Sequence, residues 1–189
     1  MSRMLFIKNM VCDRCKQVVQ QELERLNITV KTSMLGEVEI VEENADIVSI
    51  AQVLKANGFE LLDNEKDWQV EKIKNAVIQF VQEPNGTATH LTFSYYLQEK
   101  LGIDYRSLSA LFSSTEGVTI KRYLILQRIE KVKEYLTYGE LTVGQIAERM
   151  NYRSSAYFSS QFKKVTGITP SQFKKLKGNQ RKPLDKVLS

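Results

Sequence analysis

The sequence contains no apolar run close to the roughly 20 residues that a membrane-spanning helix needs. Its first residues also lack the charged, apolar and small-residue regions of a secretory signal peptide. We therefore expect a cytoplasmic protein. With 42% hydrophobic and 26% charged residues, the composition argues against a disordered chain. The length of 189 residues allows one large domain or two small ones.

The charge is distributed unevenly along the chain. Residues 1–67 hold 8 Lys and Arg against 12 Asp and Glu, a net charge of −4, and residues 68–89 hold 2 of each. Residues 90–189 hold 17 Lys and Arg against 8 Asp and Glu, a net charge of +9. Such an asymmetry is expected when only one end of a protein contacts a polyanion.

The first 67 residues alternate short strands with helices. The hydrophobic pattern predicts strands at 4–7, from 28, at 38–41 and from 59. It predicts a helix at 17–26 and a second helix that Asp46 caps and Gly58 ends. This β-α-β-β-α-β order is the ferredoxin-like arrangement. A domain of this size has only a marginal core.

The remaining chain is expected to be helical, which makes the fold class α+β. Residues 68–82 read as an amphipathic connecting helix, and Pro84-Asn85-Gly86-Thr87 predicts its end. The predicted division is 1–67 for the ferredoxin-like domain, 68–89 for the connecting helix and linker, 90–176 for a helical domain, and 177–189 for a basic C-terminal tail.

The helical domain contains an internal repeat with an offset of 50 residues. Both copies follow the pattern apolar-Ser-x-x-Phe-x4-Gly-x-Thr-x3-aromatic, which begins at Leu108 in the first copy and at Phe158 in the second. We interpret the repeat as two copies of one supersecondary unit. Each copy predicts a short helix, a tight turn at Gly102 or Asn151, and a second helix, and Thr142 is the expected cap of the short helix in the second copy. This is a helix-turn-helix pattern, whose second helix enters the major groove of DNA. Phe158 and Phe162, like Leu108 and Phe112, lie four positions apart and are expected to face the core.

Residues 90–176 resemble the DNA-binding domain of AraC/XylS-type transcription regulators. The motifs that carry the resemblance are Leu108-Ser109-x-x-Phe112, Ile146-Ala147-Glu148-Arg149-Met150 and Tyr157-Phe158-Ser159-x-x-Phe162-Lys163-Lys164-x-x-Gly167-x-x-Pro170-Ser171-x-Phe173. The resemblance implies two helix-turn-helix units joined by a long helix at about 120–136. It also implies that one monomer reads two half-sites about 34 Å apart on double-stranded DNA.

The resemblance also assigns roles to individual residues. The base-facing residues would be Arg106, Ser107, Ser109 and Ala110 in the first unit, and Ser155, Ala156, Ser159 and Ser160 in the second. Among these, Arg106 is the candidate for a bidentate contact to guanine. The phosphate contacts would come from Lys121, Arg122, Lys163, Lys164, Lys174 and Lys175. The first unit has Ser113 and Ser114 where the second has Lys163 and Lys164, which predicts weaker anchoring of the first unit to the DNA backbone.

Cysteine and histidine are scarce. The two cysteines, Cys12 and Cys15, stand between the first predicted strand and the first predicted helix. Two thiols with this spacing at a helix start can both point at one ion, and the helix N-terminus favours their thiolate form. Soft sulfur ligands favour Cu(I), with Zn(II) or another thiophilic ion as alternatives. The single histidine, His90, is assigned no role.

Residues 4–62 resemble heavy-metal-associated domains, the fold of copper chaperones. The resemblance rests on Met10-Val11-Cys12-Asp13-Arg14-Cys15, on Asn57-Gly58-Phe59 and on the order of elements. It implies that Met10 packs under the loop and is not a metal ligand. A redox pair, or an incidental pair in a dimerisation domain, are alternative interpretations.

The sequence therefore predicts a DNA-binding transcription regulator, not an enzyme, that a thiophilic metal ion controls through Cys12 and Cys15. Cu(I) is the favoured cofactor, double-stranded DNA is the partner, and a homodimer through the N-terminal domain is a further expectation. Two alternatives remain. The first is the same regulator with a dimerisation or partner-binding N-terminal module that binds no metal. The second is a metal-trafficking or thiol-redox protein that binds nucleic acid only incidentally.

Overall fold

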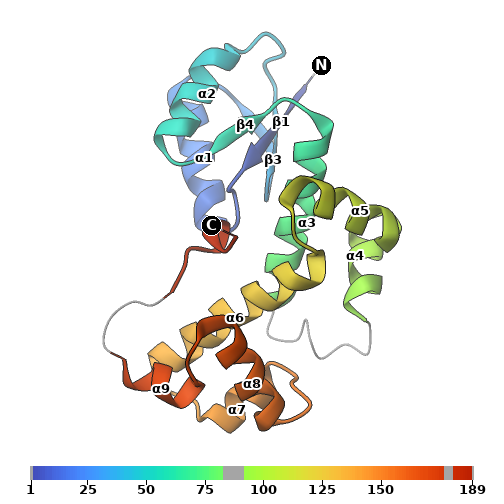
Figure 1. Cartoon of the computed structure of the whole chain (residues 1–189). Helices are drawn as coiled ribbons and strands as arrows, with labels where there is room; N and C mark the ends of the chain where they lie inside the picture. The colour runs from blue at the N-terminus through green and yellow to red at the C-terminus, as the bar shows by residue number, and fades with distance from the viewer. Residues whose placement is uncertain (1, 83–91, 177–180, 189) are drawn as a thin grey trace.

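The computed structural model describes residues 2–82, 92–176 and 181–188 (Figure 1). The predicted linker at Pro84–Thr87 and the residue His90 lie outside these ranges. A mixed α and β N-terminal part precedes a C-terminal part built of helices. In the described ranges, no helix combines the length and the apolar character that crossing a membrane requires.

The N-terminal part has the predicted β-α-β-β-α-β order. Its elements are β1 (Arg3–Lys8), α1 (Asp13–Arg25), β2 (Val30–Met34), β3 (Glu37–Ile40), α2 (Ile47–Ala56) and β4 (Glu60–Leu62). The strands form one antiparallel sheet in the order β2-β3-β1-β4. Asp46 caps α2 as predicted, because its carboxylate accepts hydrogen bonds from the backbone of Val48 and Ser49.

The two faces of the sheet are covered by different helices. Leu5 and Ile7 of β1 are buried in a core that also contains residues of α1 and α2. Phe6 points to the other face, where its ring centroid lies 4.5 Å from that of Trp68 in α3 (Glu65–Gln82). This alternation follows from the period of two residues along a strand. The third helix therefore packs on the sheet face opposite α1 and α2 (Figure 1).

The helix α3 is buried along most of its length. It begins three residues before the predicted start at Trp68, because Asn64 accepts a hydrogen bond from the backbone N–H of Asp67. From Val70 to Val81 its apolar side chains join the core of the helices that follow. An amphipathic connector would expose one full face to solvent, whereas α3 is an integral core element of the helical part.

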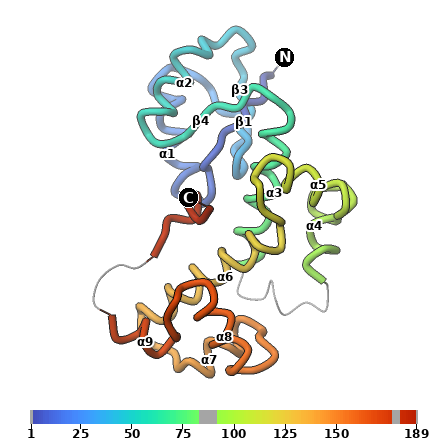
Figure 2. Tube along the Cα trace, viewed as in Figure 1, coloured from blue at the N-terminus to red at the C-terminus, as the bar shows by residue number. Residues whose placement is uncertain are grey.

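The helical part consists of two similar units on either side of one long helix. Its elements are α4 (Phe93–Leu101), α5 (Tyr105–Glu116), α6 (Ile120–Tyr138), α7 (Val143–Arg149), α8 (Ser155–Thr166) and α9 (Pro170–Lys175). The long helix α6 runs diagonally from the first unit to the second (Figure 2). Both units and α3 share one continuous hydrophobic core.

Residues 181–188 return to the body of the molecule. Leu184–Lys186 form a 3-10 turn, and the side chain of Val187 is buried in the helical core. Leu184 lines the same open cavity as Cys12 and Asp13 at the start of α1. The predicted basic tail is thus, over these eight residues, a packed segment that lies between the helical part and the N-terminal part.

Candidate nucleic-acid interface and thiol pair

The first helix-turn-helix unit consists of α4 and α5. Thr92 caps α4 through a hydrogen bond from the backbone N–H of Tyr95, and Asp104 caps α5 through one from Ser107. Between the helices, Gly102 has a φ of +67°, a left-handed conformation that glycine adopts without strain. The predicted turn at Gly102 is confirmed.

The second unit, α7 and α8, has the same construction with different residues. Thr142 and Gln145 form a capping box at the start of α7, and the Ser154 hydroxyl caps α8. Asn151 makes the turn with a φ of +52°, a conformation that asparagine tolerates better than most residues. The predicted turn at Asn151 and the predicted cap at Thr142 are both confirmed.

The structure explains the Gly-x-Thr pattern of the repeat. Gly117 and Gly167 end α5 and α8 in the left-handed conformation, and the threonine two positions later caps the next helix. The aromatic residues of the repeat make equivalent contacts in both copies. Ring centroids lie 5.5 Å apart for Phe112 and Tyr123 and 5.6 Å apart for Phe162 and Phe173. The repeated residues therefore have packing roles.

The recognition helices α5 and α8 expose the faces that the sequence predicts. Their core-facing residues Leu108, Phe112, Phe158 and Phe162 are buried. On the opposite faces, Arg106, Ser107, Ala110, Ser155, Ala156 and Ser160 are exposed, and Ser109 and Ser159 are half-buried. Each predicted base-facing set thus lies together on the N-terminal half of its helix. The structure also places Arg153, which the sequence analysis did not select, exposed directly before the cap of α8.

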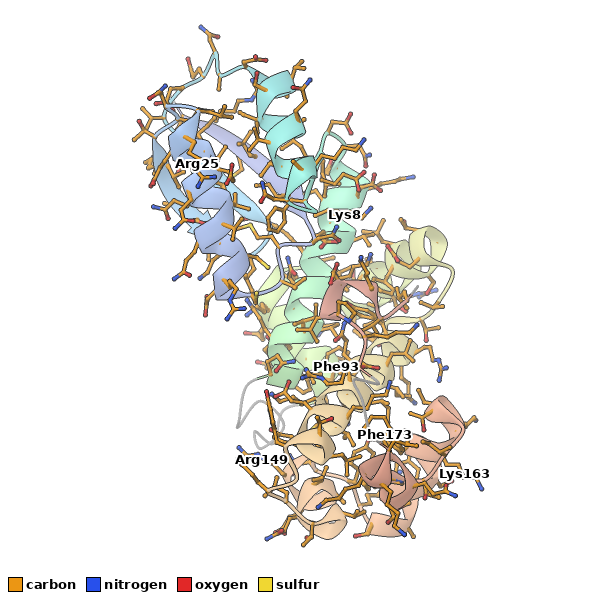
Figure 3. The ribbon with its side chains drawn as sticks, turned by 90° about the vertical axis from the view of Figure 1, so that its left-hand side faces the viewer. Lys8, Arg25, Phe93, Arg149, Lys163 and Phe173 are labelled. Atoms are coloured by element: carbon orange, nitrogen blue, oxygen red, sulfur yellow. The ribbon has the colours of Figure 1, made fainter. Side chains whose placement is uncertain are left out.

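All six predicted phosphate contacts are exposed: Lys121, Arg122, Lys163, Lys164, Lys174 and Lys175. Figure 3 shows the side chain of Lys163 on the outer side of the helical part. The ammonium of Lys174 already donates to the backbone carbonyls of Gly139 (3.4 Å) and Leu141 (3.3 Å). In the first unit, the Ser114 hydroxyl donates a hydrogen bond to the backbone carbonyl of Leu111 across 2.8 Å.

Cys12 and Cys15 lie together at the start of α1. Their sulfur atoms are 3.1 Å apart, longer than the roughly 2.05 Å of a disulfide, and both thiols are free. Cys12 occupies the N-cap position and is exposed, while Cys15 is half-buried in the first turn. Met10 is fully buried beneath the loop, as the resemblance implies.

The pKa of the Cys15 thiol lies above its ordinary value, which is opposite to the effect of a helix N-terminus alone. Burial, followed by the hydrogen bond with Cys12, raises the pKa of the Cys15 thiol, although backbone N–H groups of the helix start act in the opposite direction. The backbone groups at the helix start therefore act on Cys15 in the predicted direction, but their effect on the pKa is not the largest one. Desolvation of the thiolate in the first turn outweighs the helix end, so an incoming metal ion has to displace a proton from this sulfur.

The two sulfurs would have to separate before they could share one ion. Two thiolates on a tetrahedral ion at about 2.3 Å stand roughly 3.7 Å apart, and a two-coordinate ion, with its ligands on nearly opposite sides, requires a still larger separation than the present 3.1 Å. Cys12, the exposed partner, lies beside an open cavity. Across the described ranges, no group of three or more His, Cys, Asp or Glu residues is placed to hold a metal ion. A donor set of two sulfurs suits Cu(I) better than Zn(II).

A hydrogen bond joins the thiol loop to α3. The backbone N–H of Asn9 donates to the buried carboxylate of Glu71 across 2.9 Å. One turn further along α3, the ammonium of Lys74 lies 2.7 Å from the carboxylate of Glu116, the last residue of the recognition helix α5. Sequence reasoning missed these residues, because a polar residue within an amphipathic helix gives no signal of its partner.

An open cavity of about 580 Å³ lies beside Cys12. Its walls include Leu35 of the β2–β3 turn, Gln79 of α3, Lys100 of α4 and Leu184 of the C-terminal segment. Elements of both parts of the molecule therefore surround the exposed thiol.

Comparisons with known proteins find similar sequences. Residues 97–176 match the family described as a helix-turn-helix domain. The chain is 38% identical over 65 residues to the HTH-type transcriptional activator RhaR of Cronobacter sakazakii, and this matched segment covers 34% of the chain and 23% of RhaR. The chain is also 24% identical over 163 residues to the melibiose operon regulatory protein of Escherichia coli K12, and this segment covers 86% of the chain and 53% of that protein.

A solved structure is also similar. The C-terminal domain of AraT, a response regulator from Geobacillus stearothermophilus, matches with 27% identity and a TM-score of 0.48, over 60% of this chain and 91% of that one. The chain spans about a quarter and about half of the lengths of the two curated relatives. Residues 97–176 are thus similar in sequence to the helix-turn-helix domain family, and the curated relatives named above are described as transcriptional or operon regulators.

Proposed function

We propose that the protein is a cytoplasmic transcription regulator that binds a bipartite DNA site and responds to a thiophilic metal ion, Cu(I) before others, at Cys12 and Cys15. The observation that carries the DNA-binding part is the pair of equivalent helix-turn-helix units on the single helix α6, each with an exposed recognition face. Two such units suit successive major grooves about 34 Å apart.

The exposed residues divide into two roles. Arg106, in the first turn of α5, offers the planar pair of donors that matches the O6 and N7 acceptors of guanine. The serine and alanine positions of both helices rely on water, thymine methyl groups or DNA shape. Lysines such as Lys163 and Lys164 bind phosphate, which positions the protein without specifying a sequence.

The N-terminal part is proposed to be a metal-responsive domain of the heavy-metal-associated type. Its strand order and the position of the Cys-x-x-Cys loop before α1 support this assignment. Cys12 and Cys15 would hold the ion, which supplies a soft electrophilic centre that both sulfurs share. Met10 supports the loop from beneath, and Asn9 fixes its start to Glu71.

The contacts of α3 suggest how the two parts communicate. A shift of the thiol loop acts on Glu71 through Asn9, and Lys74 carries the effect to Glu116 at the end of α5. The two charged residues lie three positions apart on one helix and are both largely buried, so they move together. Metal binding would thus change the placement of the first recognition helix.

The test is a selection from random duplex DNA with the full-length chain, in its apo and Cu(I)-loaded forms. We expect a bipartite site with one turn of DNA between its halves. Arg106→Ala should relax the preference at one base pair of the first half-site, while Lys163→Ala should weaken all sequences alike and lower the salt slope by about one. Binding without sequence preference that disappears at moderate salt would support the trafficking alternative and contradict the proposal.

A redox role for the pair has one observation in its favour, the distance of 3.1 Å between two free thiols. Oxidation would form a disulfide after a small approach of the sulfurs. Measuring metal stoichiometry under reducing conditions separates the two roles. One Cu(I) per chain supports metal binding, whereas no bound copper together with ready disulfide formation supports the redox alternative or a non-metal module.

A further inference from the structure

Arg153 occupies a position that none of the roles above uses. It directly precedes Ser154, the N-cap of the second recognition helix α8, and its side chain is exposed. Among the residues that the structure describes, no acidic side chain forms a salt bridge with it. The N-terminal end of a recognition helix is the part that approaches the base edges in a helix-turn-helix protein.

Tyr157 forms a platform beneath Arg153. The central carbon of the guanidinium lies 5.7 Å from the centroid of the Tyr157 ring, and this ring is 49% exposed. The Tyr157 hydroxyl accepts a hydrogen bond from Gln161 across 3.4 Å, and Gln161 in turn accepts one from Tyr152 across 2.7 Å. Stacking on a ring orients the guanidinium without occupying its N–H donors.

The platform is fixed to the core of the domain. The Tyr152 ring lies 5.0 Å from the ring of Phe158, which is fully buried. The arginine is therefore held by a chain of contacts that leads from its own ring platform into the core. A side chain oriented in this way loses less conformational freedom on binding than a freely rotating one.

The other residues on the exposed face of α8 are short. Ser155, Ala156, Ser159 and Ser160 carry side chains with one polar atom or none, whereas bidentate reading of guanine requires the planar donor pair of arginine. We propose that Arg153, supported by Tyr157, reads a guanine in the second half-site. This inference rests on the proposed DNA-binding function.

The two units then place their arginines at different positions. With the offset of 50 residues, Arg106 corresponds to Ala156, and Arg153 corresponds to Ile103. Arg106 follows its helix cap by two residues, while Arg153 precedes its own cap by one. The half-sites should therefore differ, with a guanine at a different register in each.

The experiment is a DNA selection with the full-length wild type, Arg153→Ala, Arg153→Lys and Tyr157→Leu. We expect one G·C pair in the second half-site with the wild type. Its preference over other base pairs should fall about 10-fold or more in both arginine variants and by a smaller factor in Tyr157→Leu, with all other positions unchanged. Arg149→Ala is the matched control, since Arg149 lies over the ring of Tyr135 and should leave every preference intact.

Three results would overturn the inference. Unchanged base preferences with uniformly weaker binding would show that Arg153 contacts phosphate, and an equal loss of the same preference in Arg149→Ala would show a general charge effect. A Lys variant that keeps the full preference would also contradict bidentate reading. Failure of the proposed function is distinguishable, because the wild type would then select no sequence at all. Thermal unfolding of each variant confirms that the domain is folded.

Discussion

The backbone N–H of Asn9 and the carboxylate of Glu71 form a hydrogen bond of 2.9 Å between the thiol loop and α3. Asn9 has a φ of +69°, which turns the loop toward the helix, and Glu71 is only 5% exposed. The contact joins two elements that are 62 residues apart in the sequence. It ties the start of the Cys-x-x-Cys loop to α3, whose apolar residues belong to the helical core.

Glu71 should make the stability of the protein depend on pH. Burial raises the pKa of its carboxyl above the ordinary value, and the Asn9 N–H and Lys74 oppose this only in part. The unfolded chain therefore releases its proton at a lower pH than the folded one, and stability is lost as the pH rises from the unfolded pKa through the folded pKa. Glu71→Gln, which keeps the acceptor oxygen, should gain stability relative to wild type between acidic and neutral pH.

Denaturant unfolding at several pH values measures this difference. Glu65→Gln is the control, because it removes a carboxylate from the exposed face of the same helix. If the stability difference between wild type and Glu71→Gln stays constant across this pH range, the buried carboxylate has no linked protonation.

Lys74 should contribute to stability through Glu116. Their charged atoms lie 2.7 Å apart, and the side chains are 17% and 19% exposed. Lys74→Met would leave Glu116 and the neighbouring Glu71 less compensated, and we expect the free energy of unfolding to fall by about 1–2 kcal/mol. Lys66→Met, on the exposed face of α3, should change it by less than about 0.5 kcal/mol.

The same pair of variants tests communication between the two parts. The effect of Cu(I) on DNA affinity should shrink in Lys74→Met and persist in Lys66→Met. An undiminished copper effect in a folded Lys74→Met protein would contradict the route through Glu116.

The C-terminal segment should stabilise the helical part. The fully buried Gln127 donates to the carbonyl of Leu184 across 2.8 Å, and Glu130 accepts from the backbone N–H of Lys182 at the same distance. Deleting residues 181–189 removes these partners and the buried Val187. The free energy of unfolding should fall by about 2–4 kcal/mol. The exposed substitution Lys186→Ala should have little effect, and a deletion that unfolds like wild type would show that the segment is not docked in solution.

The sequence predicted the local structure of the helical part well. The cap at Thr142, the turn at Asn151 and the core-facing spacing of Phe158 and Phe162 all depend on near neighbours, and each prediction is confirmed. The repeat helped further, since the same contacts had to occur twice.

The long-range contacts could not be predicted from local sequence patterns. The partner of Glu71 is 62 residues away, and the partner of Gln127 is 57 residues away. The net direction of the Cys15 pKa shift was also outside the reach of the sequence pattern, because the burial that raises this pKa depends on tertiary packing around the loop. Arg153 was overlooked because its role depends on a ring four positions along the helix.

The most direct test of the account compares the DNA affinity of wild type with that of the double variant Cys12→Ser and Cys15→Ser, each with and without one equivalent of Cu(I) under reducing conditions. Fluorescence anisotropy on the selected duplex gives the affinity. The account predicts that Cu(I) changes the wild-type affinity by about 5-fold or more, as is typical of coupling between sites, and leaves the folded double variant unchanged. An equal copper effect in both proteins, or none in the wild type, would contradict the claim that this thiol pair controls DNA binding.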